Sequence, residues 1–346
     1  QGSLVFLVSG LAVLGYAAAL SAQPTYQAVV RAVCGAAVGK LCEVCFLLNL
    51  FMISVALLRV VGDQLEKCEL FPSLCLGLLP PWYVDQRFTL SALCVLVIFP
   101  LSVPREIGFQ KYSRYHLGYP CGGPLLGTVY PRLPPPRNLS SSWTSIFSVI
   151  PTICFGFQCH EACVAIYSSM RNQSFSHWVT VSVLSMLICL LIYSLTGLYG
   201  YLTFGEAVAS DVLMSYPGND PVVIVARLLF APLGVISPTI LPPRSVVKDL
   251  WAAPKGGAVA ECEARERRSR VALTVTWMSA TLAIALFVPD IGKVIELIGG
   301  ISAFFIFIFP GKIGQAALIA WGVLSVLGGA FVCGQSAALA VLGLLR

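Results

Sequence analysis

The segment SIFSVIPTICFGFQCHEACVAIYSS, residues 145–169, is long and apolar enough to cross a bilayer as a helix, which takes about 20 residues. Pro151 and Gly156 interrupt the apolar run, and each weakens helical hydrogen bonding, so the freed backbone groups need a partner other than lipid. His160 and Glu161 add an ionisable pair, which at that depth should face protein or a water-filled cavity. Because secondary transporters build substrate sites from broken apolar helices, we predict a transport site here.

Two other interpretations of this segment compete with a transport site. A proline kink often holds no ligand, and a single histidine can simply bond a neighbouring carbonyl, so a kink without a site fits these residues equally well. The pair His160-Glu161 begins like the helix motif of zinc proteases, but the second histidine would fall at position 164, which is Val164. The sequence also has no paired intramembrane carboxylates, no Gly-x-Ser-x-Gly motif and no phosphate-binding loop, so we expect no enzymatic activity.

The composition indicates a chain built almost wholly from membrane helices. Of its 346 residues, 57% are hydrophobic and 11% are charged, and the mean hydropathy is +0.84. A soluble globular chain has about 25% charged residues, so we predict an all-α polytopic membrane protein that has the lipid bilayer as a partner. No loop is long enough to bury a separate core, so residues 1–346 should form a single transmembrane domain. The net charge of +6 comes from basic loops and suggests no nucleic-acid partner.

Nine apolar segments are candidate spans: 4–20, 41–61, 88–104, 145–169, 178–201, 221–243, 271–289, 291–311 and 316–344. The segment 221–243 is irregular because prolines interrupt it. Residues 112–143 are rich in Pro and Gly and cannot run as a membrane helix.

The basic loops test this layout. Loops 31–40, 105–114 and 244–270 are all rich in Lys and Arg, which places all three in the cytoplasm by the positive-inside rule. They can share that side only if an odd number of spans separates residues 114 and 145, so we expect that one helix is lost or replaced there. The chain opens with Gln1 instead of Met, so we also expect that its natural N-terminus is missing. With the lost helix restored, Asn138 lies outside the cell in the sequon Asn-Leu-Ser and is a candidate glycosylation site.

Three motifs then appear in order along the chain. They are ICFGFQCHE at 153–161, GLYGYLTFG at 197–205 and IGGISA at 298–303. Their order and spacing resemble the sixth, seventh and tenth transmembrane helices of the amino acid/auxin permease family, in its sodium-coupled neutral amino acid transporter branch. The resemblance covers nearly the whole chain except about 112–142, parts of 231–243 and the stretch around 312–316.

The resemblance implies a LeuT-like fold of two inverted five-helix repeats plus a final helix, with about nine of the eleven spans present. The family's first helix is absent before Gln1, and the fifth is replaced by 112–142. In this fold an unwound part of the sixth helix binds the substrate through main-chain groups. That segment would be Phe155, Gly156, Phe157, Gln158 and Cys159, followed by His160 in a gating or hydrogen-bonding role.

A sodium ion would sit between the family's first and eighth helices, as a co-transported ion and not as a cofactor. The family's hydroxyl ligand for sodium has no clear counterpart in this chain, and Ser237 and Thr239 are the nearest candidates.

The function implied is secondary active transport of a neutral amino acid, glutamine-like or alanine-like, coupled to sodium at the plasma membrane. Two alternatives stay open. One is a membrane sensor or scaffold that binds an amino acid without moving it. The other is a truncated isoform without transport activity.

Overall fold

A computed structural model of the chain describes residues 2–66, 86–99, 143–209, 211–217, 223–224, 259–288, 291–314 and 319–345. Within these ranges all regular structure is helical, and six helices are long and apolar enough to cross a membrane. Two shorter apolar helices, Arg87–Leu96 and Val271–Phe287, coincide with two more predicted spans. The predicted all-α polytopic class is therefore confirmed.

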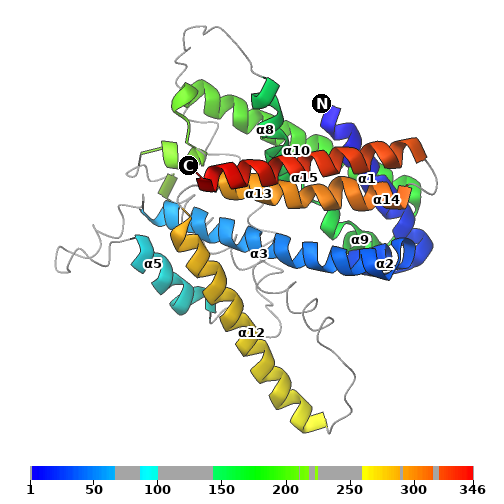
Figure 1. Ribbon diagram of the computed structural model, residues 1–346, viewed down its shortest axis with the longest axis horizontal. Helices are drawn as coiled ribbons and strands as arrows, with labels where there is room; N and C mark the ends of the chain where they lie inside the picture. The colour runs from blue at the N-terminus through cyan, green and yellow to red at the C-terminus, as the bar shows by residue number, and fades with distance from the viewer. Residues whose placement is uncertain are drawn as a thin grey trace, which may run out of the picture. The chain divides into compact units, whose positions relative to one another are not determined.

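The helices follow one another along the chain as labelled in Figure 1. They are α1 (Gly2–Ser21), α2 (Tyr26–Cys34), α3 (Ala36–Glu66), α5 (Gln86–Leu93), the π-helix η2 (Cys94–Ile98), α8 (Trp143–Gly156), α9 (His160–Ser169), α10 (Phe175–Phe204), the 3-10 turns η4 (Gly205–Ala207) and η5 (Val212–Ser215), α12 (Val259–Phe287), α13 (Ile291–Ala303), the π-helix η6 (Phe304–Ile308), α14 (Phe309–Gly314) and α15 (Ile319–Leu345). Asn138, Ser237 and Thr239 lie outside the described residues, as do 112–142 and most of 221–243.

One helix stands where the sequence predicts only a loop. Residues 31–40 are expected to connect two spans, yet α2 occupies Tyr26–Cys34. The side chain of Thr25 accepts a hydrogen bond from the Ala28 N–H and caps this helix, and one face of the helix buries Tyr26, Val29 and Val30. The helix ends at Gly35, whose φ of 90° is a conformation that favours glycine.

The chain divides into two compact units. Unit 1 comprises Gln1–Asn49, Pro136–Leu195 and Gly292–Arg346, and unit 2 comprises Leu50–Pro135 and Thr196–Ile291.

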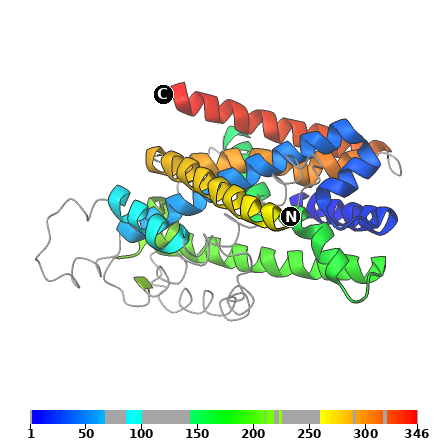
Figure 2. The same cartoon turned by 90° about the horizontal axis from the view of Figure 1, so that it is seen from below.

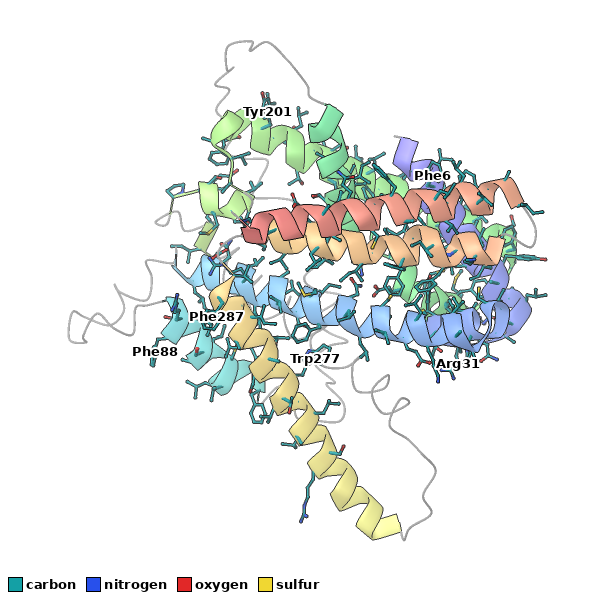
Figure 3. The ribbon with its side chains drawn as sticks, viewed as in Figure 1. Phe6, Arg31, Phe88, Tyr201, Trp277 and Phe287 are labelled. Atoms are coloured by element: carbon teal, nitrogen blue, oxygen red, sulfur yellow. The ribbon has the colours of Figure 1, made fainter. Side chains whose placement is uncertain are left out.

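In unit 1 the helix α1 contacts α2, α9, η6 and α14, and α15 runs beside η6 and α14 (Figures 1 and 2). Leu7, Leu11 and Leu14 form the buried face of α1, at 4% exposure or less. These spacings of three and four residues place them on one side of the helix. Near one end of α1, the ring of Phe6 stacks on Trp321 of α15 with centroids 4.7 Å apart (Figure 3).

Unit 2 has a smaller apolar core. Val55, Leu58 and Val61 of α3 pack with residues of α5, η2 and α12. Phe51 contacts Trp277 of α12 edge to face, with ring centroids 5.3 Å apart (Figure 3). An Arg59–Asp63 ion pair of 2.9 Å lies on the α3 helix of this unit.

Glycines allow helices of unit 1 to approach closely. A Cβ placed on Gly299 of α13 would lie 1.9 Å from the carbonyl oxygen of Pro151 in α8. A Cβ on Gly15 of α1 would lie 2.2 Å from Nε1 of Trp178, which donates a 2.9 Å hydrogen bond to the Leu11 carbonyl. Small residues at such contacts are typical of membrane helix packing, where van der Waals contact replaces the hydrophobic effect as the driving force.

We predict that Gly299→Ala destabilises the chain by at least about 1–3 kcal/mol, because α8 must move to admit the methyl group. Thermal unfolding of the purified chain in lipid nanodiscs measures this effect. Gly334→Ala in α15 is the matched control, because no described residue outside its own stretch of helix lies within 4 Å of its Cβ position. If both variants unfold at the wild-type temperature, α8 and α13 do not pack as closely at Gly299 as the structure shows.

Candidate functional site

The candidate site is a helix break in unit 1. The helix α8 ends at Gly156 and α9 begins at His160, so Phe157–Cys159 is unwound. The interruption lies where the sequence predicts it, but it is shorter than the predicted segment, because Phe155 and Gly156 still belong to the last turn of α8. Pro151 does not end the helix, which continues for five more residues and stops at the glycine.

The break changes how the backbone is paired. The N–H groups of Phe157, Gln158 and Cys159 donate to the carbonyls of Ile153, Phe155 and Phe157, over 2.9–3.2 Å. None of these three backbone hydrogen bonds ends on the carbonyl of Cys154 or Gly156.

On the other side of the break, Cys159 caps α9 without a side-chain hydrogen bond, and the first N–H groups of a helix have no partner inside it. Carbonyls that attract cations thus lie within a few residues of N–H groups that attract anions.

Side chains brace the unwound segment from two other helices. Gln158 Nε2 donates to Glu161 Oε1 over 2.7 Å. Ser302 Oγ of α13 lies 2.7 Å from Gln158 Oε1 and 2.8 Å from the Ile298 carbonyl oxygen, and its hydroxyl can donate to either one. Asn49 Nδ2 of α3 donates to the same Glu161 oxygen. Asn49 and Ser302 are fully buried. The Gln158 side chain is thus committed to protein contacts, which leaves its main chain as the part available to a ligand.

His160 is buried against α1. Its Nε2 lies 3.0 Å from the Leu7 carbonyl oxygen, and its Nδ1 has no hydrogen-bond partner in the described part of the chain. Gly10 makes room for the ring, since a Cβ there would lie 3.0 Å from His160 Nε2. The imidazole therefore links α9 to α1, which fits the hydrogen-bonding half of its predicted role.

Two of the remaining predicted residues, Phe157 and Cys159, contact the helix α10. The Phe157 ring meets Tyr193 of α10 edge to face at 5.2 Å, and Cys159 Sγ lies 3.9 Å from Met186 Sδ of the same helix. Gly156 is exposed, and among the described residues the nearest atom to a Cβ placed on it is Cε2 of Tyr193, 3.9 Å away. Phe155 is half-buried in the last turn of α8.

Asn49 and Ser302 are not among the residues predicted from the sequence for this site, and Glu161 was singled out there only as half of an ionisable pair and not as a substrate-binding residue. Glu161 stands in the first motif and Ser302 in the third, so their motifs are the signal that could have found them. Their contacts join residues 112 and 144 positions apart, which no local pattern reveals. Among the described residues, no group of three or more His, Cys, Asp or Glu side chains could hold a metal ion.

Comparison with known proteins agrees with this architecture. Residues 130–319 match the family described as transmembrane amino acid transporter protein. The chain is 55% identical to human solute carrier family 38 member 8, over 98% of this chain and 84% of that protein. It is 51% identical to the putative sodium-coupled neutral amino acid transporter 8 of Xenopus tropicalis, over 99% of this chain and 85% of that protein.

A second group of relatives extends the match. Human sodium-coupled neutral amino acid transporter 7 is 42% identical, over 99% of this chain and 79% of its own length. The resemblance inferred from three motifs is thereby confirmed, as is the expectation of a transporter in place of an enzyme. The chain is a multi-pass membrane protein that belongs to the transmembrane amino acid transporter family.

Proposed function

We propose that this chain moves a neutral amino acid, glutamine-like or alanine-like, across the plasma membrane together with sodium. The substrate binds at the break between α8 and α9. The observation that carries the proposal is the unwound segment Phe157–Cys159 inside an otherwise apolar span.

The charges of a zwitterion fit the main chain at this break. The substrate carboxylate binds at the start of α9, at His160 and Glu161, as anions bind at helix N-termini in other proteins; the next N–H, that of Ala162, pairs with the Cys159 carbonyl. The carbonyls of Cys154 and Gly156, which the backbone ladder passes over, can accept an ammonium group. No additional charged residue is needed to hold either end of the substrate.

The side chain of the substrate should be uncharged and of modest size. Glu161 Oε1 accepts from Gln158 and Asn49, and the Ser302 hydroxyl lies 2.7 Å from Gln158 Oε1. Their polar groups are therefore not free to pair with a charged substrate side chain, which would have to be desolvated without compensation. Open space beside Gly156 can accept a short side chain.

Sodium coupling is supported by the relatives, several of which are named as sodium-coupled neutral amino acid transporters. The candidate ligands Ser237 and Thr239 lie outside the described residues. The direct test reconstitutes the full chain in proteoliposomes and measures uptake of labelled glutamine and alanine, with sodium or choline outside. Uptake that needs sodium supports the proposal, whereas binding without uptake would indicate a sensor.

We predict that Gly156→Leu abolishes uptake without unfolding the chain. The leucine side chain would fill the space beside the break, and within the described part of the chain a Cβ there has one neighbour inside 4 Å, Tyr193 at 3.9 Å. Gly328→Leu in α15 is the control, because its Cβ position is also open but lies in the last long helix, away from the break in the sequence. Uptake at the wild-type rate by folded Gly156→Leu would refute the site.

A second prediction concerns the brace on Gln158. Ser302→Ala removes the hydroxyl that lies 2.7 Å from Gln158 Oε1 and can donate to it or to the Ile298 carbonyl, and an unpaired Gln158 oxygen costs about 1–3 kcal/mol. We expect the KM for the amino acid to rise by roughly tenfold or more, because each 1.4 kcal/mol is a factor of ten.

Ser168→Ala is the matched control for this experiment, since the Ser168 hydroxyl donates only to Val164 in its own helix at 2.9 Å. Equal KM values for both variants would show that Ser302 does not position the break.

A further inference from the structure

We propose that Glu161 is a proton-binding site of this transporter. Its carboxyl is held as the acid by Asn49, and it gives up the proton when substrate occupies the break. The inference rests on the proposed function for its link to substrate, but the protonation itself can be tested without transport.

The first observation is the lack of a cationic partner. Glu161 lies in the membrane-spanning segment Val149–Ser169, and its contacts in the described part of the chain are the amides of Asn49 and Gln158. By contrast, two acidic side chains of α3 are paired with a cation, Glu43 with Arg31 and Asp63 with Arg59. An ionised carboxylate without such a partner is costly inside a membrane, and a proton is the simplest neutralising group.

The second observation is the unpaired oxygen of Asn49. This residue is fully buried, its Nδ2 donates to Glu161 Oε1, and its Oδ1 has no hydrogen-bond partner among the residues that the structure describes. A carboxylic acid and a primary amide pair through two hydrogen bonds, one from the amide N–H and one from the acid O–H to the amide oxygen. The first bond is present, and the second needs the hydrogen that only the acid form carries. Protonation of Glu161 therefore supplies the donor that Asn49 Oδ1 lacks.

The surrounding titratable groups do not replace that proton. Tyr26 of α2 and Cys42 of α3 lie within electrostatic range of Glu161, and neither carries a positive charge. The Tyr26 hydroxyl donates to the Phe305 carbonyl over 3.1 Å. His160 precedes Glu161 in the chain, but its ring faces the Leu7 carbonyl. Gln158, the remaining neighbour, is uncharged.

The break connects this proton to substrate. Gln158 belongs to the unwound segment, and its amide donates to the same Glu161 oxygen that Asn49 contacts. When the ammonium group of a substrate enters beside the Gly156 carbonyl, it brings a positive charge within a few residues of Glu161. The carboxyl O–H then ionises, its proton passes to water in the opened site, and the carboxylate is stabilised by the new cation. No other bond is made or broken.

The first experiment detects the acid directly. Infrared difference spectra of the full chain in nanodiscs, recorded across pH, should show a C=O band of a protonated carboxyl that disappears in Glu161→Gln. A glutamine there can donate to Asn49 Oδ1 as the acid does, so this variant should fold. Glu43→Gln is the matched control, because Glu43 is ion-paired with Arg31 and its loss should leave the band unchanged. A band that persists in Glu161→Gln, or no band in the wild type, overturns the proposal.

The second experiment measures the link to substrate. Amino acid affinity of the wild type should rise with pH, by up to about tenfold per pH unit, the limit for release of one proton. Glu161→Gln should bind with an affinity that does not vary with pH, and Glu43→Gln should behave as the wild type. Equal pH dependence in wild type and Glu161→Gln overturns the link. If no amino acid binds to the wild type, the proposed function fails, while the infrared band still decides the protonation of Glu161.

Discussion

A broken helix inside a membrane is possible only if the protein itself satisfies the backbone and side-chain groups at the break, because lipid offers no hydrogen bonds. In this chain Glu161 is the centre of that compensation. It accepts from Gln158 in the unwound segment and from Asn49 on α3, while Ser302 on α13 holds the other end of the Gln158 amide. Three helices thus fix one short non-helical segment, and its main chain stays available for a ligand.

Close packing between helices also fixes the position of this segment. Gly299 lets α13 approach the backbone of α8, and the motif that contains it also contains Ser302, one turn further along. The close contact with α8 and the hydrogen bond to Gln158 therefore both come from one short sequence, IGGISA. On the other side, α1 holds His160 through the Leu7 carbonyl and Trp178 through the Leu11 carbonyl. The break is surrounded by rigid helices, which is what a site needs if it binds through fixed dipoles.

The sequence predicts the class of fold and the place of the break because both depend on local chemistry. Apolar runs indicate spans, and the Gly156 and His160-Glu161 positions mark the interruption. The partners of the break were beyond prediction, since Asn49, Ser302 and Leu7 lie more than 100 residues from the residues that they contact. The helix α2 was missed for a different reason. It is short and amphipathic, and only the Thr25 cap and the Val29-Val30 pair indicate it.

The two acidic residues of unit 1 with described partners show how environment separates their roles. Glu43 and Glu161 both lie in apolar helices, but Glu43 has the guanidinium of Arg31 and Glu161 has two amides. An ion pair fixes a charge and serves structure, because neither partner gains from losing it. An acid held by amides can exist in two protonation states, because its carboxyl accepts hydrogen bonds from the amides when ionised and can also donate one to an amide oxygen when protonated. A carboxyl of the second kind, two residues after the break that we propose as the substrate site, is suited to report whether that break is occupied.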